Sequence, residues 1–328
     1  MDWGRFEQLA QFHRVEGICW DCLAPHESHL PAAVADALSS AATAIALQNL
    51  NATAESATLV ASFRAANVPI FFLKGLTLGT LAYRNYATKS AIDIDLLIDP
   101  TDLLTSASLL RRQGYRLVIP KDSVGEEALR AWHRLNKESV WAKGESGLQI
   151  DLHTRLADNP SLIPDITVNS PSQTVDVGGL SLPTLAPEEL FSYLAVHGAS
   201  SAWFRLKWIS DFAGLLHPLD NHEIEQFYRR SQELEAGRAA GQALLLADAL
   251  FGSMDENESL RRELSADRAT RWLFHAALRQ VSGSPDEPTE HRFGTLAIHA
   301  TQFLLKPGIR YKASELAGQM GRFVARQH

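Results

Sequence analysis

Apolar side chains recur at three- and four-residue intervals over residues 1–66. The segments RFEQLAQFHRV and LPAAVADALSSAATAIALQNLNATAESATLVASFRAANV show this spacing, and the second is rich in alanine. Such spacing is typical of amphipathic helices, and the near absence of glycine and proline favours them further. We therefore expect two or three helices in an N-terminal helical region that ends at residue 66.

The pattern changes at Val68. The short apolar run VPIFFL predicts a buried strand, and the alternation in AIDIDLLID predicts a second one. A helix is expected between them over LTLGTLAYRN, and two more over DPTDLLTSASLLRRQGY and GEEALRAWHRL. Further strands are expected at YRLVIP, ESVWAK and GLQIDLHTRLA, the last two joined by a tight GES turn.

Residues 67–157 thus predict a mixed α/β unit, and we end this domain at residue 185, after a polar, proline-containing stretch from Asp158. Helical spacing then returns in APEELFSYLAVHGASSAWFRLKWISDFAGLL and continues toward the end of the chain. The expected fold class is therefore α+β: a small mixed-sheet unit between an N-terminal helical region and a C-terminal helical domain over 186–328.

Composition narrows the possible functions. The 328 residues are 45% apolar and 21% charged, with a formal net charge of −7. A general nucleic-acid binder would normally be basic, so that class is not expected. No segment reaches the roughly 18 apolar residues of a membrane span, and the first residues lack the apolar core of a signal peptide. We expect a soluble, cytoplasmic protein that does not bind membranes.

Cys19 and Cys22 form a C-x-x-C pair. No second pair completes a zinc site, and no βαβ unit surrounds the motif as a thioredoxin-like redox pair would require. We interpret the two cysteines as small apolar residues on a helix turn.

Two aspartates interrupt the second predicted strand. Residues two apart on a strand point to the same face, so Asp93 and Asp95 project together while Ile94 and Leu96 point the other way. Two adjacent carboxylates repel, so replacing either is expected to leave the stability of the metal-free protein unchanged or higher. A divalent cation between them would remove the repulsion, and Mg²⁺ prefers oxygen ligands. The alternative is a solvated face of an edge strand.

Asp151 lies in the similar surroundings Ile-Asp-Leu. If its strand is beside the first acidic strand, the three carboxylates form a cluster suited to metal-assisted phosphoryl transfer. Lys74 and Gly75 end the VPIFFL strand, where glycine would let the backbone approach a phosphate near the start of the next helix. Lys74 could instead be a solvated strand end.

These motifs lead to a family resemblance. The order LKG, helix, tyrosine, basic residue, DIDLL and a later acidic strand resembles the nucleotidyltransferases of the DNA polymerase β superfamily. More closely, the chain is similar to a bacterial branch of uncharacterised nucleotidyltransferases with the pattern LKG…L…Y…R…DIDLLV, followed by E/D-h-H-x-R-L. DLHTRL matches the second element, and LFSYLAVHGASSAWFRLKWISDFAGLL resembles the helical segment of that branch. The resemblance covers most of the chain.

The resemblance implies that Asp93, Asp95 and Asp151 are the ligands of Mg²⁺ or Mn²⁺ and that a nucleoside triphosphate is the substrate. It also implies that Lys74 with Gly75 replaces the Gly-Ser phosphate turn of better-known members.

Two positions depart from the family pattern. Leu76 stands where a serine usually contacts phosphate. Lys89 stands where the branch usually has an arginine, and it is the basic residue expected near the nucleotide.

Four more residues are candidates for nucleotide or metal contacts. His153 and Arg155 alternate with Asp151 and could share its strand face. His153 could bind a metal or orient a carboxylate, or both could be surface residues beyond the strand. Arg205 and Trp208 lie at three-residue spacing on a predicted helix, where Trp208 could stack on a base and Arg205 could reach a phosphate. The alternative for both is ordinary packing between helices.

We therefore interpret the chain as a metal-dependent nucleotidyltransferase. A hydroxyl of an unknown acceptor, such as a small molecule, sugar, peptide or protein, would attack the α-phosphorus of the nucleoside triphosphate. Two alternatives stay open: a non-catalytic nucleotide- or protein-binding module on the same fold, and a peptide or sugar tailoring enzyme that transfers another group.

Overall fold

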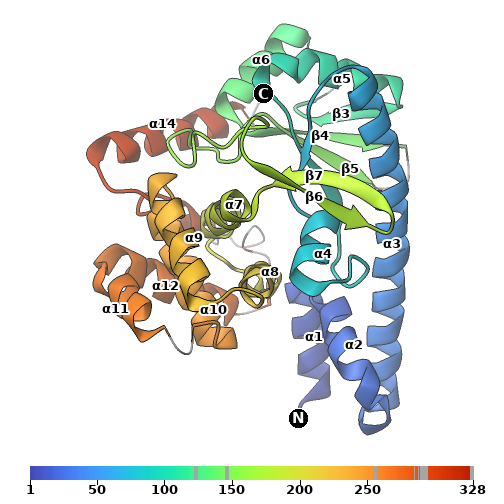
Figure 1. Cartoon of the computed structure of the whole chain (residues 1–328), viewed down its shortest axis with the longest axis vertical. Helices are drawn as coiled ribbons and strands as arrows, with labels where there is room; N and C mark the ends of the chain where they lie inside the picture. Colours follow the sequence, from blue (N-terminus) through green and yellow to red (C-terminus); the bar gives the residue numbers. More distant parts are fainter. Residues whose placement is uncertain are drawn as a thin grey trace.

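The protein contains a five-stranded mixed sheet with helices on both faces (Figure 1). The structure is a computed structural model of the whole chain. It describes residues 1–121, 125–144, 148–254, 257–283, 285–286, 288 and 295–325. The expected fold class is confirmed, since a mixed sheet is flanked by an N-terminal and a C-terminal helical region.

The strand order in the sheet is β1-β2-β5-β4-β3, and a separate hairpin pairs β6 with β7. Among the strands of the described residues, β2 and β5 pair in parallel, and the other pairs are antiparallel. The strands are β1 (Phe71–Phe72), β2 (Asp93–Leu97), β3 (Tyr115–Ile119), β4 (Glu138–Lys143), β5 (Gln149–His153), β6 (Ser172–Val177) and β7 (Leu180–Leu185).

Helices make up most of the rest of the described chain. Before and within the sheet they are α1 (Trp3–His13), α2 (Glu16–Leu23), η1 (Ala24–His29), α3 (Ala32–Ala65), α4 (Leu76–Tyr83), η2 (Pro100–Asp102), α5 (Leu103–Arg112) and α6 (Glu126–Leu135). After the sheet they are α7 (Pro187–Ser200), α8 (Leu206–Leu216), α9 (Asn221–Glu233), α10 (Gly237–Phe251), α11 (Glu258–Ala266), α12 (Arg268–Val281), α13 (Leu296–Gln302) and α14 (Ile309–Ala325).

One face of the sheet is covered by α3 and α5. Ile94 and Leu96 of β2 belong to this core, as do Ile150 and Leu152 of β5. Phe63 of α3 packs into the same cluster. The alternation expected for β2 is therefore confirmed: its isoleucine and leucine enter an apolar core, and its aspartates point to the opposite face.

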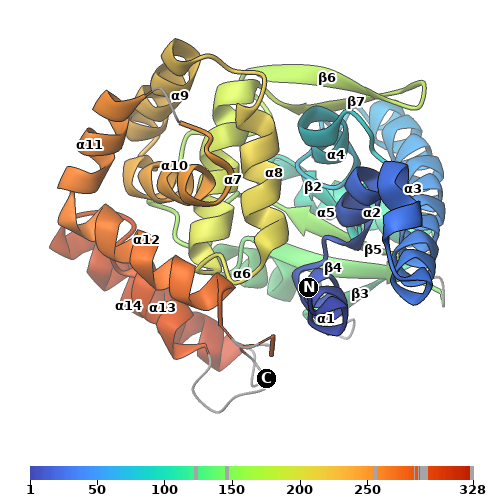
Figure 2. The ribbon, with the colours of Figure 1, turned by 90° about the horizontal axis from the view of Figure 1, so that it is seen from below.

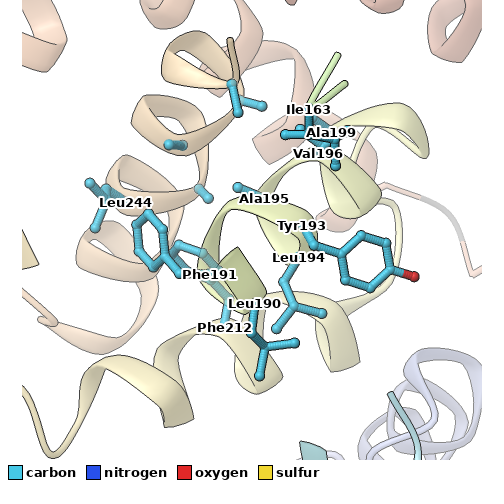
Figure 3. Close-up of a cluster of buried hydrophobic side chains, with 14 of the residues drawn as sticks. Ile163, Leu190, Phe191, Tyr193, Leu194, Ala195, Val196, Ala199, Phe212 and Leu244 are labelled. Carbon is cyan, nitrogen blue, oxygen red and sulfur yellow. The ribbon is translucent and has the colours of Figure 1, made fainter. Parts of the chain in front are cut away.

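The other face meets α7, which lies with α8 between the sheet and the remaining C-terminal helices (Figure 2). Leu73 and Leu97 contribute to this second core from the sheet side. Phe191 of α7 packs against Phe212 with ring centroids 4.8 Å apart. Figure 3 shows Tyr193 leaving α7 on a different side from Phe191, and both side chains are buried.

The buried strand predicted in VPIFFL is confirmed but is shorter than the run, since it comprises only Phe71–Phe72 at the edge of the sheet. Pro69 lacks the N–H that a longer ladder needs. The polar, proline-containing stretch 158–185, for which no strand was predicted, contains the β6–β7 hairpin. Gly178 and Gly179 form its turn with φ of 61° and 86°, a backbone region that glycine enters without steric cost.

Other local predictions agree with the structure. The N-terminal region has three α-helices, and Cys19 and Cys22 both lie on α2 as free thiols. Asp99 starts η2 by accepting a hydrogen bond from the Thr101 backbone N–H (2.9 Å). The tight turn expected at 144–146 lies partly outside the described residues. None of the described helices combines the length and the apolar character that a bilayer crossing requires.

Candidate active site

The parallel pairing of β2 with β5 brings the acidic residues together. Asp95 pairs with Asp151 in the register, and Leu97 pairs with His153. One ligand atom from each of Asp95, Asp151 and His153 lies within 4.8 Å of the other two. The prediction that the strand of Asp151 is next to that of the aspartate pair is confirmed, and three potential metal ligands share one face of the sheet.

The two carboxylate oxygens of Asp95 have different surroundings. Oδ1 is 2.8 Å from Lys74 Nζ and 3.1 Å from His153 Nε2. Oδ2 is buried and has no hydrogen-bond partner among the described residues. A buried charged oxygen without a partner is costly, and a divalent cation is one group that would complete it. The donor set at this position therefore fits a hard metal ion.

Asp93 lies one pleat away on the same strand face and is half-buried. It is outside the group of atoms within 4.8 Å, but its charge acts on Lys74 and Asp151. The structure thus places Asp93 beside the cluster, and its role as a metal ligand stays a prediction.

Two residues that the sequence interpretation missed complete the cluster. Glu138, the first residue of β4, is directly opposite His153, and its Oε2 is 3.2 Å from His153 Nε2. Lys137 Nζ is 2.5 Å from the same carboxylate oxygen. No sequence signal marks Glu138, because only the antiparallel pairing of β4 with β5 brings it to His153.

Charges in the cluster shift one another's pKa values. Burial alone would raise the pKa of Asp95, but the Lys74 ammonium and the His153 ring hold it well below its usual range. Burial and the charges of Asp95 and Glu138 raise the pKa of Asp151 to about 8. In the metal-free protein at neutral pH, Asp95 is therefore ionised and Asp151 is largely protonated.

The α7 side chains Tyr193 and His197 lie close enough to respond to this cluster. Burial raises the pKa of Tyr193 to about 12, and its hydroxyl has no partner among the described residues. Burial, together with the charges of Lys74 and Lys137, holds the pKa of His197 well below its usual value. His197 is thus a neutral imidazole at physiological pH.

Gly75 connects the first strand to α4 with φ of 62° and ψ of −117°. A side chain would strain this backbone, so the position requires glycine. The hydroxyl of Thr77 donates to the Lys74 carbonyl (3.1 Å), which holds the turn in place beside the cluster. Lys74 is not a solvated strand end, since its ammonium is paired with Asp95.

Lys89 is buried and lies 3.4 Å from Asp211 of α8. Tyr83 donates to the other oxygen of that carboxylate (2.9 Å). The side-chain amide of Asn49 donates to the Lys89 carbonyl (2.7 Å). These contacts fix the segment that precedes β2 between α3, α4 and α8, and the expected contact of Lys89 with the nucleotide stays a prediction.

Arg155 does not share the face of Asp151, so that prediction is wrong. β5 ends at His153, and the chain turns away before Arg155. Its guanidinium donates to the backbone carbonyls of His133 (2.5 Å) and Ala157 (3.1 Å). Arg155 thus stabilises the loop after β5.

Arg205 and Trp208 have different surroundings in the structure. Arg205 is buried at the N-cap position of α8, and its guanidinium contacts the backbone carbonyl and the ring of Phe12 in α1. Trp208 lies near the site: its ring is 5.8 Å from the His197 ring. Lys207 Nζ is also 5.8 Å from the Trp208 ring, and burial with the charge of Lys89 lowers the Lys207 pKa to about 7. Base stacking by Trp208 stays a prediction.

Comparison with known proteins agrees with this geometry. No curated protein matches the chain. A family described as uncharacterised nucleotidyltransferase matches residues 1–252, a range that contains the sheet, α7, α8 and every candidate site residue named above. The match extends over more than three quarters of the 328 residues. The chain therefore belongs to the family of uncharacterised nucleotidyltransferases.

Proposed function

We propose that the protein transfers a nucleotidyl group from a nucleoside triphosphate to a hydroxyl of an acceptor, with the help of a divalent cation. The observation that carries this proposal is the meeting of Asp95 and Asp151 on adjacent parallel strands, with the buried Oδ2 of Asp95 lacking a partner among the described residues. Membership of a nucleotidyltransferase family supports the same reaction class.

Asp95 and Asp151 would hold Mg²⁺ or Mn²⁺, and Asp93 lies on the same strand face to assist them. When bound, such an ion neutralises charge on the phosphates and on the leaving pyrophosphate. Metal binding requires Asp151 in its ionised form, so the cation must displace the proton that this carboxyl holds near neutral pH.

The Lys74–Gly75 turn is the proposed place of the triphosphate. Gly75 has no side chain to block close approach, and no side chain caps the N-terminus of α4 among the described residues. Lys74 already lies at this point, where its ammonium is paired with Asp95. The acceptor oxygen would form a bond to the α-phosphorus while the bond to the β-phosphate oxygen breaks and pyrophosphate leaves.

The test is release of pyrophosphate and transfer of label from each of four α-labelled nucleoside triphosphates, in Mg²⁺ or Mn²⁺, with a mixture of candidate hydroxyl acceptors. We expect Asp95→Asn and Asp151→Asn to abolish both signals. Glu189→Gln is the matched control, because Glu189 is a buried carboxylate whose partner is Arg230 on α9.

Variants that release pyrophosphate at the wild-type rate would contradict the proposal. Nucleotide-dependent thermal stabilisation of the wild type, without turnover in any mixture, would instead favour a non-catalytic nucleotide-binding module.

A further inference from the structure

The carboxylate of Glu138 has two partners at the edge of the acidic cluster. Its Oε2 contacts Lys137 Nζ (2.5 Å) and His153 Nε2 (3.2 Å). Its backbone carbonyl accepts a hydrogen bond from the indole of Trp132 (2.8 Å). A side chain held in this way can serve as a rigid acceptor for its neighbour.

His153 lies between two carboxylates. The ring is fully buried, and Nε2 is 3.1 Å from Asp95 Oδ1 as well as 3.2 Å from Glu138 Oε2. Nδ1 is buried without a partner among the described residues. In the tautomer with the proton on Nδ1, the lone pair of Nε2 would face both carboxylates, and the Nδ1–H would have no acceptor. In the tautomer with the proton on Nε2, the two carboxylates can share the Nε2–H as acceptors. The network therefore assigns the proton to Nε2.

With this tautomer, the two carboxylate oxygens of Asp95 have different hydrogen-bonding roles. Oδ1 accepts from Lys74 Nζ and from the His153 ring, and Oδ2 has no partner in the described part of the chain. The two contacts of Oδ1 oppose rotation of the carboxylate. Oδ2 is left as the oxygen that can bind the metal of the proposed function.

We propose that Glu138 is a positioning residue of the metal site: it orients His153, which in turn holds Asp95 so that Oδ2 faces the cation. His153 acts through its Nε2–H and is not itself a metal ligand. This inference rests on the proposed function, because it assumes that Asp95 binds a divalent cation.

The probe for the test is Mn²⁺ alone, titrated into the full-length protein and followed by the EPR signal of the free ion. Loss of a residue that orients a metal ligand typically weakens metal affinity by about 10- to 100-fold. We expect a loss of this size in Glu138→Ala. Glu138→Gln, whose amide oxygen still accepts from Nε2–H, should stay near the wild type.

Both Glu138→Ala and Glu138→Gln leave the Lys137 ammonium without its carboxylate partner. Lys137→Met is therefore added to the wild type and to both variants, so that the stabilities of the three proteins stay comparable. Glu189→Gln again serves as the control for loss of a buried carboxylate elsewhere, and its Mn²⁺ affinity should equal that of the wild type.

A double-variant cycle separates positioning from general destabilisation. His153→Ala should lose as much Mn²⁺ affinity as Glu138→Ala, and the two changes together should lose no more than either alone, because they interrupt the same chain of contacts. Additive losses would mean that Glu138 acts independently of His153 and would overturn the proposal.

The wild-type protein loaded with Mn²⁺ provides a test that needs no variant. Pulsed EPR should show no coupling from a directly coordinated ¹⁴N nucleus. A coupling that disappears in His153→Ala would identify His153 as a ligand and overturn its role as a donor. Failure of the wild type to bind Mn²⁺ at all would reject the proposed function, whereas wild-type affinity in Glu138→Ala would reject only the positioning role.

Discussion

At the scale of single residues, Asp151 and Asp95 make contributions to stability that depend on pH in opposite directions. The pKa of Asp151 is about 8 in the folded protein, against a reference value of 3.8, because the side chain is buried near Asp95 and Glu138. Its contribution to stability is fully present below about pH 4 and is lost as the pH rises through 8. The pKa of Asp95 is lowered, so its contribution is present above about pH 4 and is lost as the pH falls further.

Asp151→Asn should therefore stabilise the metal-free protein increasingly as the pH rises. One pKa unit corresponds to about 1.4 kcal/mol, and about 1 kcal/mol moves the Tm of a chain of this size by about 2 °C. After discounting half of the shift for solvent screening, we expect the Tm of the variant to gain about 5 °C on the wild type between pH 4 and pH 8. Thermal unfolding in a chelator, at several pH values, measures this difference.

Asp95→Asn is the contrasting variant, and it should lower the Tm at neutral pH because Lys74 loses its buried partner. A difference between Asp151→Asn and the wild type that does not change with pH would contradict the raised pKa. The sequence analysis expected replacement of Asp95, like that of Asp93, to leave stability unchanged or higher, because it saw two repelling carboxylates on one strand and not the Lys74 ammonium paired with Asp95.

The same limit explains which site residues could be predicted. Asp93, Asp95 and Asp151 follow from alternation within a strand, which is a local property. Arg155 was wrongly added to that face because alternation does not show that β5 ends at His153. Glu138 was missed because its proximity to His153 depends on the pairing of β4 with β5, which no local pattern reveals.

At the scale of elements, the close contact of α4 with α8 fixes the position of α4, which begins at the Gly75 turn of the candidate site. Helix α8 carries Asp211, which binds Tyr83 of α4. Gly214 makes this approach possible: a Cβ there would lie 2.8 Å from the Ala82 carbonyl oxygen, which belongs to the α4 backbone. The two helices would have to move apart to admit any side chain.

Gly214→Ala should destabilise the protein by about 1–3 kcal/mol, the usual cost of overpacking a tight contact. Gly4→Ala is the matched control, since Gly4 is an exposed helical glycine whose added Cβ would meet only an Asp2 side-chain oxygen at 3.7 Å. That change should stabilise the protein by about 0.5–1 kcal/mol through helix propensity. Urea unfolding of both variants measures the two effects, and equal stabilities would show that α4 and α8 can separate without cost.

The β6–β7 hairpin shows where element prediction failed for a different reason. Val175, Val177, Leu180 and Leu182 alternate with polar residues on either side of Gly178–Gly179, which is a recognisable hairpin signal. The hairpin was not predicted, because Pro183 and the polar residues upstream are unusual in a strand. The structure accommodates Pro183 because this two-stranded sheet consists only of edge strands, where a missing N–H is tolerated.

At the scale of the whole molecule, the sheet is covered by helices that precede and follow it in the chain. Leu59 and Phe63 of α3 close one face, and Leu190 of α7 belongs to the core that includes Leu97 of β2. The acidic cluster lies on the α7 side of the sheet, so the geometry of the site depends on helices outside the segment that carries its carboxylates. The boundaries expected at residues 66 and 185 follow changes in the sequence pattern. In the structure, each boundary cuts through a hydrophobic core that continues on both sides of it.

The excised segment 67–185 should consequently fail to fold on its own. Without α3 and α7, large apolar side chains on both sheet faces lose their cover, at about 1.5–3 kcal/mol for each one exposed. Uncovering about half a dozen would cost about 9–18 kcal/mol, which is as large as the roughly 5–15 kcal/mol by which a domain of ordinary stability is folded. We expect the segment to give a poorly dispersed ¹H–¹⁵N spectrum and no cooperative urea transition, while the full chain under the same conditions gives both. A dispersed spectrum from the segment would show instead that the sheet and its hairpin form an independent domain, and that the helices on either side serve the site without being needed for the fold.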